Sequence, residues 1–356
     1  MTRYSPIQQL APQDCVSSIN GIIDKFDALV ALGARDAVDQ FKSLFGLASL
    51  TDDRDFAQTI AFPIGGPFFY PTNTWQELGW DPSFGSDDFW HFCTNVTNLY
   101  APESITAVDY ALSNYTNGEP WTNLGNYVYY VKNFVVDQHC PSEELINTPT
   151  CFGTQNITYW ADSSNTMDRS YLYSACTESG TYQAAPETGP SLLSRVIKGD
   201  YTQQWCSWAF PPGKYNSIPA SGPNVTWYNM YSDSDDPSNP YGSFDFHADR
   251  LAFVSGSQDV WLDLCYHAHQ GPLRTSSDLH PELLITGAGH HWDSYGIGDI
   301  AAEPQFIRNA HLFEIRSVER WLRTFGSWKA EKLKRAKKAR SALANRSKSA
   351  AAGISL

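Results

Sequence analysis

The sequence lacks the signatures of membrane, nucleotide-binding and common metal proteins. No run approaches the roughly 18 consecutive apolar residues of a membrane-spanning helix, so we predict no membrane span. There is no Gly-x-x-x-x-Gly-Lys-Ser/Thr loop to hold phosphates. There is also no His-Glu-x-x-His zinc motif, and a polar-loop role accounts for His267 and His269 better than zinc binding. We therefore predict neither a metal nor a cofactor.

Basic residues are scarce outside the C-terminus. The 356 residues include 25 Lys and Arg against 38 Asp and Glu. Nine of the basic residues lie in 329–356 beside the single acid Glu331, which leaves 16 basic against 37 acidic residues in 1–328. An acidic body repels phosphate backbones, so we expect no nucleic-acid partner. We interpret the basic tail as a solvated helix extension, with a nucleic-acid or nuclear-import patch as the alternative.

The seven cysteines form no Cys-x-x-Cys pair, which excludes the usual zinc and redox spacings and leaves disulfides or buried thiols. Five Asn-x-Ser/Thr sequons are present, of which four are our glycosylation candidates: Asn95, Asn114, Asn156 and Asn224. Cysteines and sequons together favour a secreted or vacuolar/lysosomal protein. Residues 1–10 show no signal peptide. Either the protein is cytosolic, or the printed sequence lacks the first residues of the complete protein. The odd number of cysteines favours the second interpretation.

Apolar and aromatic residues are abundant, at 42% and 14%, which is enough for a sizeable core. Apolar residues at helical spacing predict two helices within 13–46, separated near Gly33, and further helices at 86–100, 104–113 and 121–137. Residues 138–222 contain four of the cysteines and many Ser, Thr, Gly and Pro. They are predicted to be loops joined by disulfides.

The last third differs, because short apolar runs appear at 251–254 and 283–285, each followed by a turn with Gly. Both are typical of buried parallel strands. Apolar residues at helical spacing in 308–325 predict an amphipathic helix that covers the sheet. We therefore predict an α/β fold in three parts: a mainly helical part at 1–222, an α/β part at 223–327, and a basic tail at 328–356 that is disordered or a frayed helix.

Polar residues follow both predicted strands. Asp259 lies after the first strand and His290 after the second. In an α/β-hydrolase the triad acid follows one strand of the sheet and the histidine follows the last. A carboxylate that holds one imidazole nitrogen leaves the other free to take a proton from a serine hydroxyl. Asp259 and His290 are therefore our predicted catalytic pair, and the fold an incomplete α/β-hydrolase with a helical cap.

The same segments resemble a known family. Gly-Ser-Gln-Asp-Val-Trp at 256–261 resembles the Asp-Pro-Trp segment of the prolyl carboxypeptidase and dipeptidyl peptidase II family of serine peptidases. Gly-Ala-Gly-His-His-Trp-Asp at 287–293 resembles its Gly-Ala-His-His-x-Asp segment, in the form of its secreted fungal members. Residues 171–178 resemble its Tyr-x-x-Cys-Thr-Glu stretch, and the helix at 308–322 its closing helix. The helical first part would then correspond to the family's cap.

The resemblance implies roles and an activity. Asp259 would be the triad acid, His290 the general base, and Trp261 a wall of the pocket for the residue before the cleaved bond. His291 would be a neighbour of the base. The implied activity is acyl-enzyme hydrolysis of proline-containing peptides near a terminus. The sequence departs from the family in Val260, where Pro is common, but this change removes no catalytic group.

The resemblance also bears on the cysteines. Cys176 matches a family cysteine and Cys206 flanks the same loop-rich stretch, so we expect a disulfide between them. Weaker candidates are Cys15 with Cys93 and Cys140 with Cys151, which would leave Cys265 alone.

No Gly-x-Ser-x-Gly or close variant occurs in the sequence, whereas the family's nucleophile lies in a Gly-x-Ser-Tyr elbow before the cap. Ser86, Ser243 and Ser257 follow glycines but lack the strand-turn-helix setting of a nucleophile. We expect the nucleophile to precede residue 1, so that this chain is the C-terminal portion of a secreted exopeptidase and inactive by itself. The alternative is a non-catalytic paralogue whose cap serves as a binding or inhibitory surface.

Overall fold

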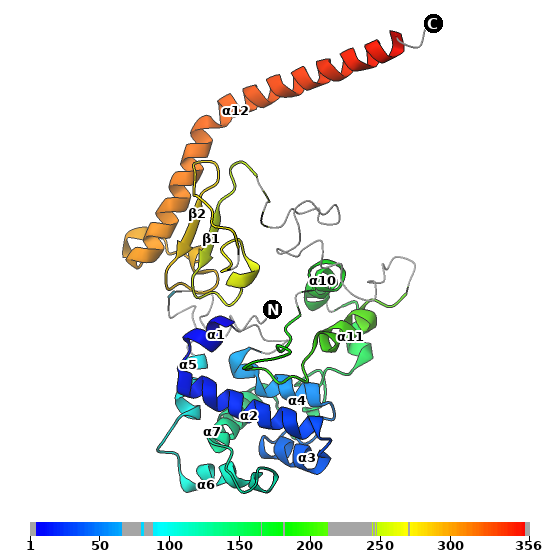
Figure 1. The fold of residues 1–356 in the computed structure, drawn as a ribbon, viewed down its shortest axis with the longest axis vertical. Coiled ribbons are helices and arrows are strands. Elements are labelled where there is room, and N and C mark those ends of the chain that lie inside the picture. Colours follow the sequence, from blue (N-terminus) through cyan, green and yellow to red (C-terminus); the bar gives the residue numbers. More distant parts are fainter. Residues whose placement is uncertain are drawn as a thin grey trace. The chain divides into compact units, whose positions relative to one another are not determined.

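The computed structural model describes residues 5–65, 80–81, 88–164, 166–180, 182–212, 244, 246, 248–269 and 271–352. The contacts divide the chain into two compact units (Figure 1). Unit 1 comprises Met1–Phe246, Ser255–Pro272 and Thr286–Tyr295. Unit 2 comprises His247–Val254, Leu273–Ile285 and Gly296–Leu356.

Unit 1 is mainly helical. Its first helices are α1 (Ser5–Leu10), α2 (Gln13–Ala31), α3 (Arg35–Leu44) and α4 (Asp53–Ile60). Its later helices are α5 (Asp88–Val96), α6 (Glu103–Thr106), α7 (Leu124–Tyr130), α8 (Asp137–His139), α9 (Ile157–Ala161), α10 (Thr166–Ser174) and α11 (Gly199–Ala209). A π-helical turn follows α7 at Val131–Val136, and another follows α10 at Ala175–Ser179.

The helices predicted from periodicity in residues 13–137 are present. α2 and α3 are the pair expected within 13–46, and α2 buries Ile19, Ile22 and Phe26 on one face. Gly33 separates them with a φ of 68°, a left-handed conformation that costs glycine little and therefore ends a helix readily. α5 and α7 lie within two of the other predicted segments, whereas 104–113 holds only the short α6, which begins at Glu103, and a 3-10 turn at Ala107–Tyr110. Helical periodicity was sufficient for α2, α3, α5 and α7 because their buried residues are mostly apolar.

The prediction of loops for residues 138–222 was wrong in part, because α9, α10 and α11 lie there. In α11 the buried residues Tyr201, Trp205, Cys206 and Ala209 recur at helical spacing. Gln and Ser residues on the other positions of this helix lower its average hydrophobicity and obscured the pattern. α4 also went unpredicted, although Phe56 and Ile60 form a short buried stripe.

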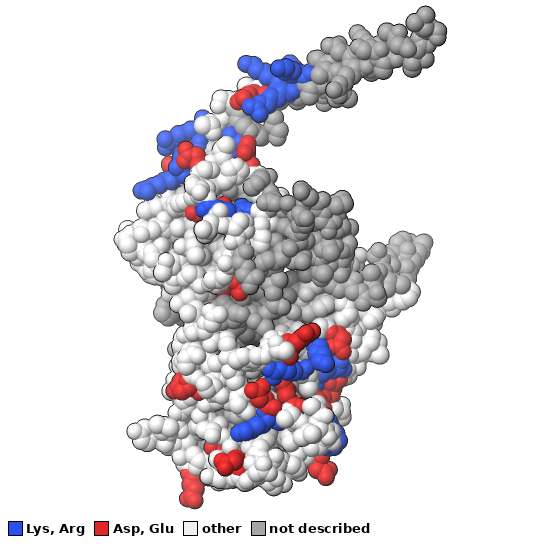
Figure 2. All heavy atoms as spheres, in the orientation of Figure 1, with Lys and Arg blue, Asp and Glu red and all other residues white. Residues whose placement is uncertain are grey.

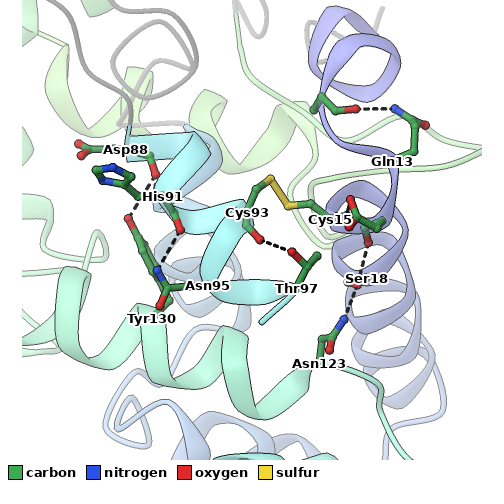
Figure 3. Close-up of a disulfide and its surroundings, with 12 residues drawn as sticks. Gln13, Cys15, Ser18, Asp88, His91, Cys93, Asn95, Thr97, Asn123 and Tyr130 are labelled. Atoms are coloured by element: carbon green, nitrogen blue, oxygen red, sulfur yellow. Dashed lines mark hydrogen bonds between the residues drawn. A yellow bond between two sulfur atoms is a disulfide. The ribbon is translucent and has the colours of Figure 1, made fainter. Parts of the chain in front are cut away.

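Three disulfides join the helices and loops of unit 1, and their pairings are those proposed from the sequence. Cys15 of α2 bonds to Cys93 of α5, Cys140 to Cys151, and Cys176 to Cys206 of α11; Cys265 is a free thiol. Figure 3 shows the first bridge between its two helices. The longest loop that a bridge closes is 78 residues, and covalent closure of long loops restricts the unfolded chain most.

The sheet consists of two strands within the described residues, β1 (Phe253–Gly256) and β2 (Glu282–Ile285). Phe253 N donates to Pro281 O and Gln258 N donates to Ala288 O, so both strands advance in the same direction and are parallel, as predicted. The prediction that they are buried was wrong, since both strands are mostly half-buried and Leu284 is 43% exposed. The physical reason is that two paired strands lie side by side, so neither covers the faces of the other.

Helix α12 (Gln305–Ala352) packs on β2 with its first part, which confirms the helix predicted at 308–325. It continues past the sheet into the basic segment (Figure 1). Figure 2 shows Lys and Arg atoms gathered along this continuation, where Lys334, Arg335, Lys337 and Lys338 are exposed. None of the described helices is both long and apolar enough to cross a membrane.

Candidate active site

Asp259 and His290, the predicted catalytic pair, lie in the turns that follow β1 and β2. The Oδ2 atom of Asp259 is 2.9 Å from Nδ1 of His290, and their side chains are 7% and 21% exposed. The carboxyl ends of adjacent parallel strands meet at one edge of a sheet, which is why turns 31 residues apart come together. The structure therefore brings the two side chains into direct contact.

Close backbone packing holds the two turns against each other. A Cβ atom on Gly256 would lie 2.4 Å from the carbonyl oxygens of Ala288 and Gly289, so the approach requires glycine. Gln258 N donates to Ala288 O at 2.9 Å, and Gly287 N donates to Ser257 Oγ at 2.8 Å. These contacts leave little freedom in the distance between the acid and the imidazole.

The carboxylate of Asp259 is oriented by its own turn. Its Oδ1 atom accepts a hydrogen bond of 2.8 Å from Trp261 N, while Oδ2 faces His290. Val260 and Leu262, which alternate in the sequence with Asp259 and Trp261, are buried. Val260 belongs to the hydrophobic core of unit 1. Packing of these side chains anchors the turn, so both carboxylate oxygens have defined partners.

The imidazole of His290 has one nitrogen engaged and one available. With Asp259 ionised, Nδ1 carries the proton and donates to the carboxylate, which leaves Nε2 as the basic nitrogen. Within the described part of the chain, Nε2 has no hydrogen-bond partner. This arrangement can take a proton at Nε2 and hold the resulting imidazolium beside a carboxylate.

His291 lies directly against His290. Its ring stacks on that of His290 with centroids 3.6 Å apart, and its backbone adopts a φ of 62°, which a side chain of this size rarely occupies. Burial and the adjacent His290 lower the pKa of His291. The hydrogen bond to Asp259 belongs to His290, and the role of His291 as a neighbour of a catalytic base stays a prediction.

Trp261 donates its backbone N–H to Asp259, and its half-buried indole packs against the core of unit 1. Its role as a wall of the substrate pocket stays a prediction.

None of the described serine hydroxyls is hydrogen-bonded to His290. Ser257 Oγ accepts from Gly287 N, and Ser255 Oγ lies 3.0 Å from Nδ1 of His267, a contact that sequence patterns did not reveal. Ser86 and Ser243 lie outside the described residues. Burial and the carboxylates of Asp259 and Asp263 raise the pKa of the Cys265 thiol to about 12, so this nearby group is a poor nucleophile.

His269, considered above as a zinc ligand, and His290 both have carboxylate contacts. His269 Nδ1 lies 2.9 Å from Asp263 Oδ1, and His290 pairs with Asp259. In the described ranges no group of three or more His, Cys, Asp or Glu side chains could hold a metal ion.

The glycosylation candidates fall in different settings. Asn114 and Asn156 are exposed, whereas Asn95 is half-buried in α5 and donates from Nδ2 to His91 O at 2.9 Å (Figure 3). Asn224 lies outside the described residues. Modification at these positions stays a prediction, and Asn114 and Asn156 offer the more accessible amides.

The chain is similar to three fungal serine peptidases. It is 29% identical over 341 residues to a probable extracellular serine carboxypeptidase of Arthroderma benhamiae, with 90% of the chain and 43% of that protein covered. It is 24% identical to serine protease vicPa of Bipolaris victoriae, with 92% and 58% covered, and 26% identical to vicPb of the same fungus, with 90% and 57% covered. The chain thus spans about half the length of the curated relatives it matches. No protein-family profile matches it.

Proposed function

We propose that this chain supplies the acid and the base of a secreted, vacuolar or lysosomal serine exopeptidase. The observation that carries the proposal is the 2.9 Å contact between Asp259 Oδ2 and His290 Nδ1, with Nε2 unpartnered within the described residues. Similarity to serine peptidases over 90% of the chain supports the same class of chemistry. The remaining catalytic group is a serine hydroxyl from a part of the complete protein outside these 356 residues.

In this mechanism Nε2 of His290 removes the proton from the serine hydroxyl as its oxygen attacks the carbonyl carbon of the scissile bond. Asp259 holds Nδ1–H and stabilises the imidazolium that forms. The imidazolium then gives its proton to the leaving amine, and the acyl-enzyme remains. Water repeats the sequence on the acyl-enzyme, with His290 again the base, and releases the carboxylic acid.

The proposed substrates are peptides cleaved near a terminus after proline. Trp261 would contact the residue before the cleaved bond, because an indole face suits a small apolar ring. Residues 1–222 would be the cap and 223–327 the catalytic part, followed by the tail at 328–356. The assignment of proline rests on the resemblance of the two active-site segments to the prolyl peptidases.

The test begins with the native transcript, translated in frame upstream of Met1. The complete protein should contain a Gly-x-Ser-Tyr elbow, react with a fluorophosphonate probe at that serine, and cleave a post-prolyl peptide faster than its alanyl equivalent. The 356-residue chain should not react. Equal rates on the two peptides would contradict the preference for proline. Labelling of a serine within the 356 residues would contradict the proposal that the nucleophile lies outside this chain. A transcript without the elbow would favour a binding protein instead.

A further inference from the structure

A hollow of about 500 Å³ lies in unit 2 between α12 and the segment 276–278. The α12 side presents Asn309, Leu312, Phe313 and Arg316. This volume lies within the roughly 300–1,000 Å³ typical of small-molecule sites. Its lining includes neither Asp259 nor His290, so it is a separate feature of the chain.

The helical wall of the hollow is one stripe of α12. Leu312 and Phe313 are adjacent in the sequence, and each lies three or four residues from both Asn309 and Arg316, while Arg320 follows Arg316 by four; these spacings place all five on the same helix face. The stripe is apolar in its middle and carries polar or basic groups at its ends. A ligand here would therefore meet both an apolar surface and a cation.

The opposite wall is fixed in place by contacts at both of its ends. Trp321 Nε1 donates to Asp278 O at 2.7 Å, and Arg320 Nη1 lies 2.8 Å from Asp278 Oδ1. Glu282 N donates to Ser276 Oγ at 3.0 Å, which ties the same segment to β2. These contacts hold both walls in position without a ligand, so the hollow is preformed.

Hydrogen-bond donors outnumber acceptors among the groups left available. Ser276 Oγ, Ser277 Oγ and Asn309 Oδ1 each already accept a hydrogen bond, from Glu282 N, His280 N and Gln305 Nε2 respectively. Their hydroxyl and amide hydrogens can still be donated to a ligand. A hollow that offers mainly donors is suited to an acceptor such as a carboxylate.

Arg316 supplies the free cation. Arg320 is engaged with Asp278 and with Ser317 Oγ, whereas Arg316 has neither a hydrogen bond nor an ion pair within the described residues. One free guanidinium matches one negative charge. The carboxylate of Asp278 on the facing wall would repel a dianion such as phosphate. A ligand ammonium group would find few free hydrogen-bond acceptors in the hollow.

We propose that this hollow binds a small monocarboxylate that carries an apolar group and no free amine. The carboxylate pairs with Arg316, and the apolar group packs on Leu312 and Phe313. An N-acylated apolar amino acid, which is also the chemistry of a short peptide's C-terminal end, meets each of these requirements. The site does not depend on the proposed peptidase activity.

The test is a calorimetric titration of the 356-residue chain with N-acetyl-L-phenylalanine. We expect millimolar or tighter binding, and Arg316→Gln to weaken it roughly tenfold, since a charge-assisted hydrogen bond is lost. Leu312→Asn should also weaken binding. Arg323→Gln removes the same charge from α12 outside the hollow and should leave the affinity unchanged within about twofold.

Two further probes separate the ligand classes. N-acetyl-L-phenylalaninamide, which lacks the negative charge, should bind about tenfold more weakly than the acid. Inorganic phosphate should bind no better than the amide. Equal affinity for acid and amide, an unchanged affinity in Arg316→Gln, tighter binding of phosphate, or no detectable heat with the acid would each overturn the proposal. Arg316 is exposed and has no ion-pair partner among the residues that the structure describes, so its variant should retain the parent melting temperature, which checks the fold.

Discussion

The backbone of Gly256 lies against that of Ala288 so closely that a Cβ on the glycine would be 2.4 Å from the Ala288 carbonyl oxygen. This approach sets the distance between the two turns that carry Asp259 and His290. The geometry of the candidate active site therefore depends on the absence of a side chain three residues before the acid.

Gly256→Ala should force the turns apart and destabilise the chain by about 1–3 kcal/mol, the usual cost of overpacking. Loss of the contact between Asp259 and His290 should accompany it, seen by NMR as the loss of the hydrogen-bonded Nδ1 proton signal of His290. Gly298→Ala is the matched control, since a Cβ at Gly298 meets nothing within 4 Å. Equal effects of the two substitutions would contradict the role of Gly256.

Asp259→Asn should lower kcat of the complete protein by about 10⁴, because an amide no longer holds Nδ1–H of His290 and cannot stabilise the imidazolium. Its effect on folding should be far smaller than its effect on activity. Asp263→Asn removes a carboxylate that pairs with the exposed His269 and serves as the control. Loss of activity with Asp263→Asn but not with Asp259→Asn would exclude Asp259 as the triad acid.

The three disulfides should differ in their contribution to stability. The Cys15–Cys93 bridge closes 78 residues and the Cys140–Cys151 bridge 11. Loop-closure entropy then predicts losses of about 4.5 and about 2.8 kcal/mol when each pair is replaced by alanine. Denaturant unfolding of the two double variants measures the difference, and a smaller loss for the Cys15–Cys93 pair would show that another effect dominates.

Three buried carboxyl groups should make the helical unit less stable as pH rises through the acidic range. Burial raises the pKa of Asp27, Asp55 and Asp109 above the model-peptide value of 3.8. The folded state therefore binds protons more tightly than the unfolded state, so unfolding free energy falls as pH rises from about 3.8 through the raised pKa values. This sign is opposite to that of an acid stabilised by an ion pair.

Asp55 offers the sharpest test of this pH dependence, because its carboxylate accepts hydrogen bonds from Thr154 and Tyr201 in the core. Asp55→Asn should flatten the decline of melting temperature with pH, whatever its effect on absolute stability. Asp36→Asn replaces an exposed carboxylate of α3 and should leave the slope unchanged. An unaltered slope in Asp55→Asn would show that burial of this group does not control the pH response.

Prediction from sequence succeeded where the signal is local. The buried stripe of α2 and the short runs that became β1 and β2 depend on spacings of a few residues, which any chain displays in its sequence. It failed for α11, where polar residues between Tyr201 and Trp205 weakened the apolar period. It also overestimated the burial of the strands, because burial depends on neighbours that a short run does not specify.

The sequence by itself determined the helical hairpin, the direction and position of both strands, and the pair Asp259 and His290 as candidates. Only the tertiary structure decided that Asp259 Oδ2 lies 2.9 Å from His290 Nδ1, and that 276–278 and the Arg316 face of α12 enclose a hollow. The physical reason is the sequence separation over which each kind of interaction acts. Periodicity and turn chemistry act over a few residues, whereas contacts between distant segments depend on strand pairing, close glycine packing and hydrogen bonds such as that from Trp321 to Asp278.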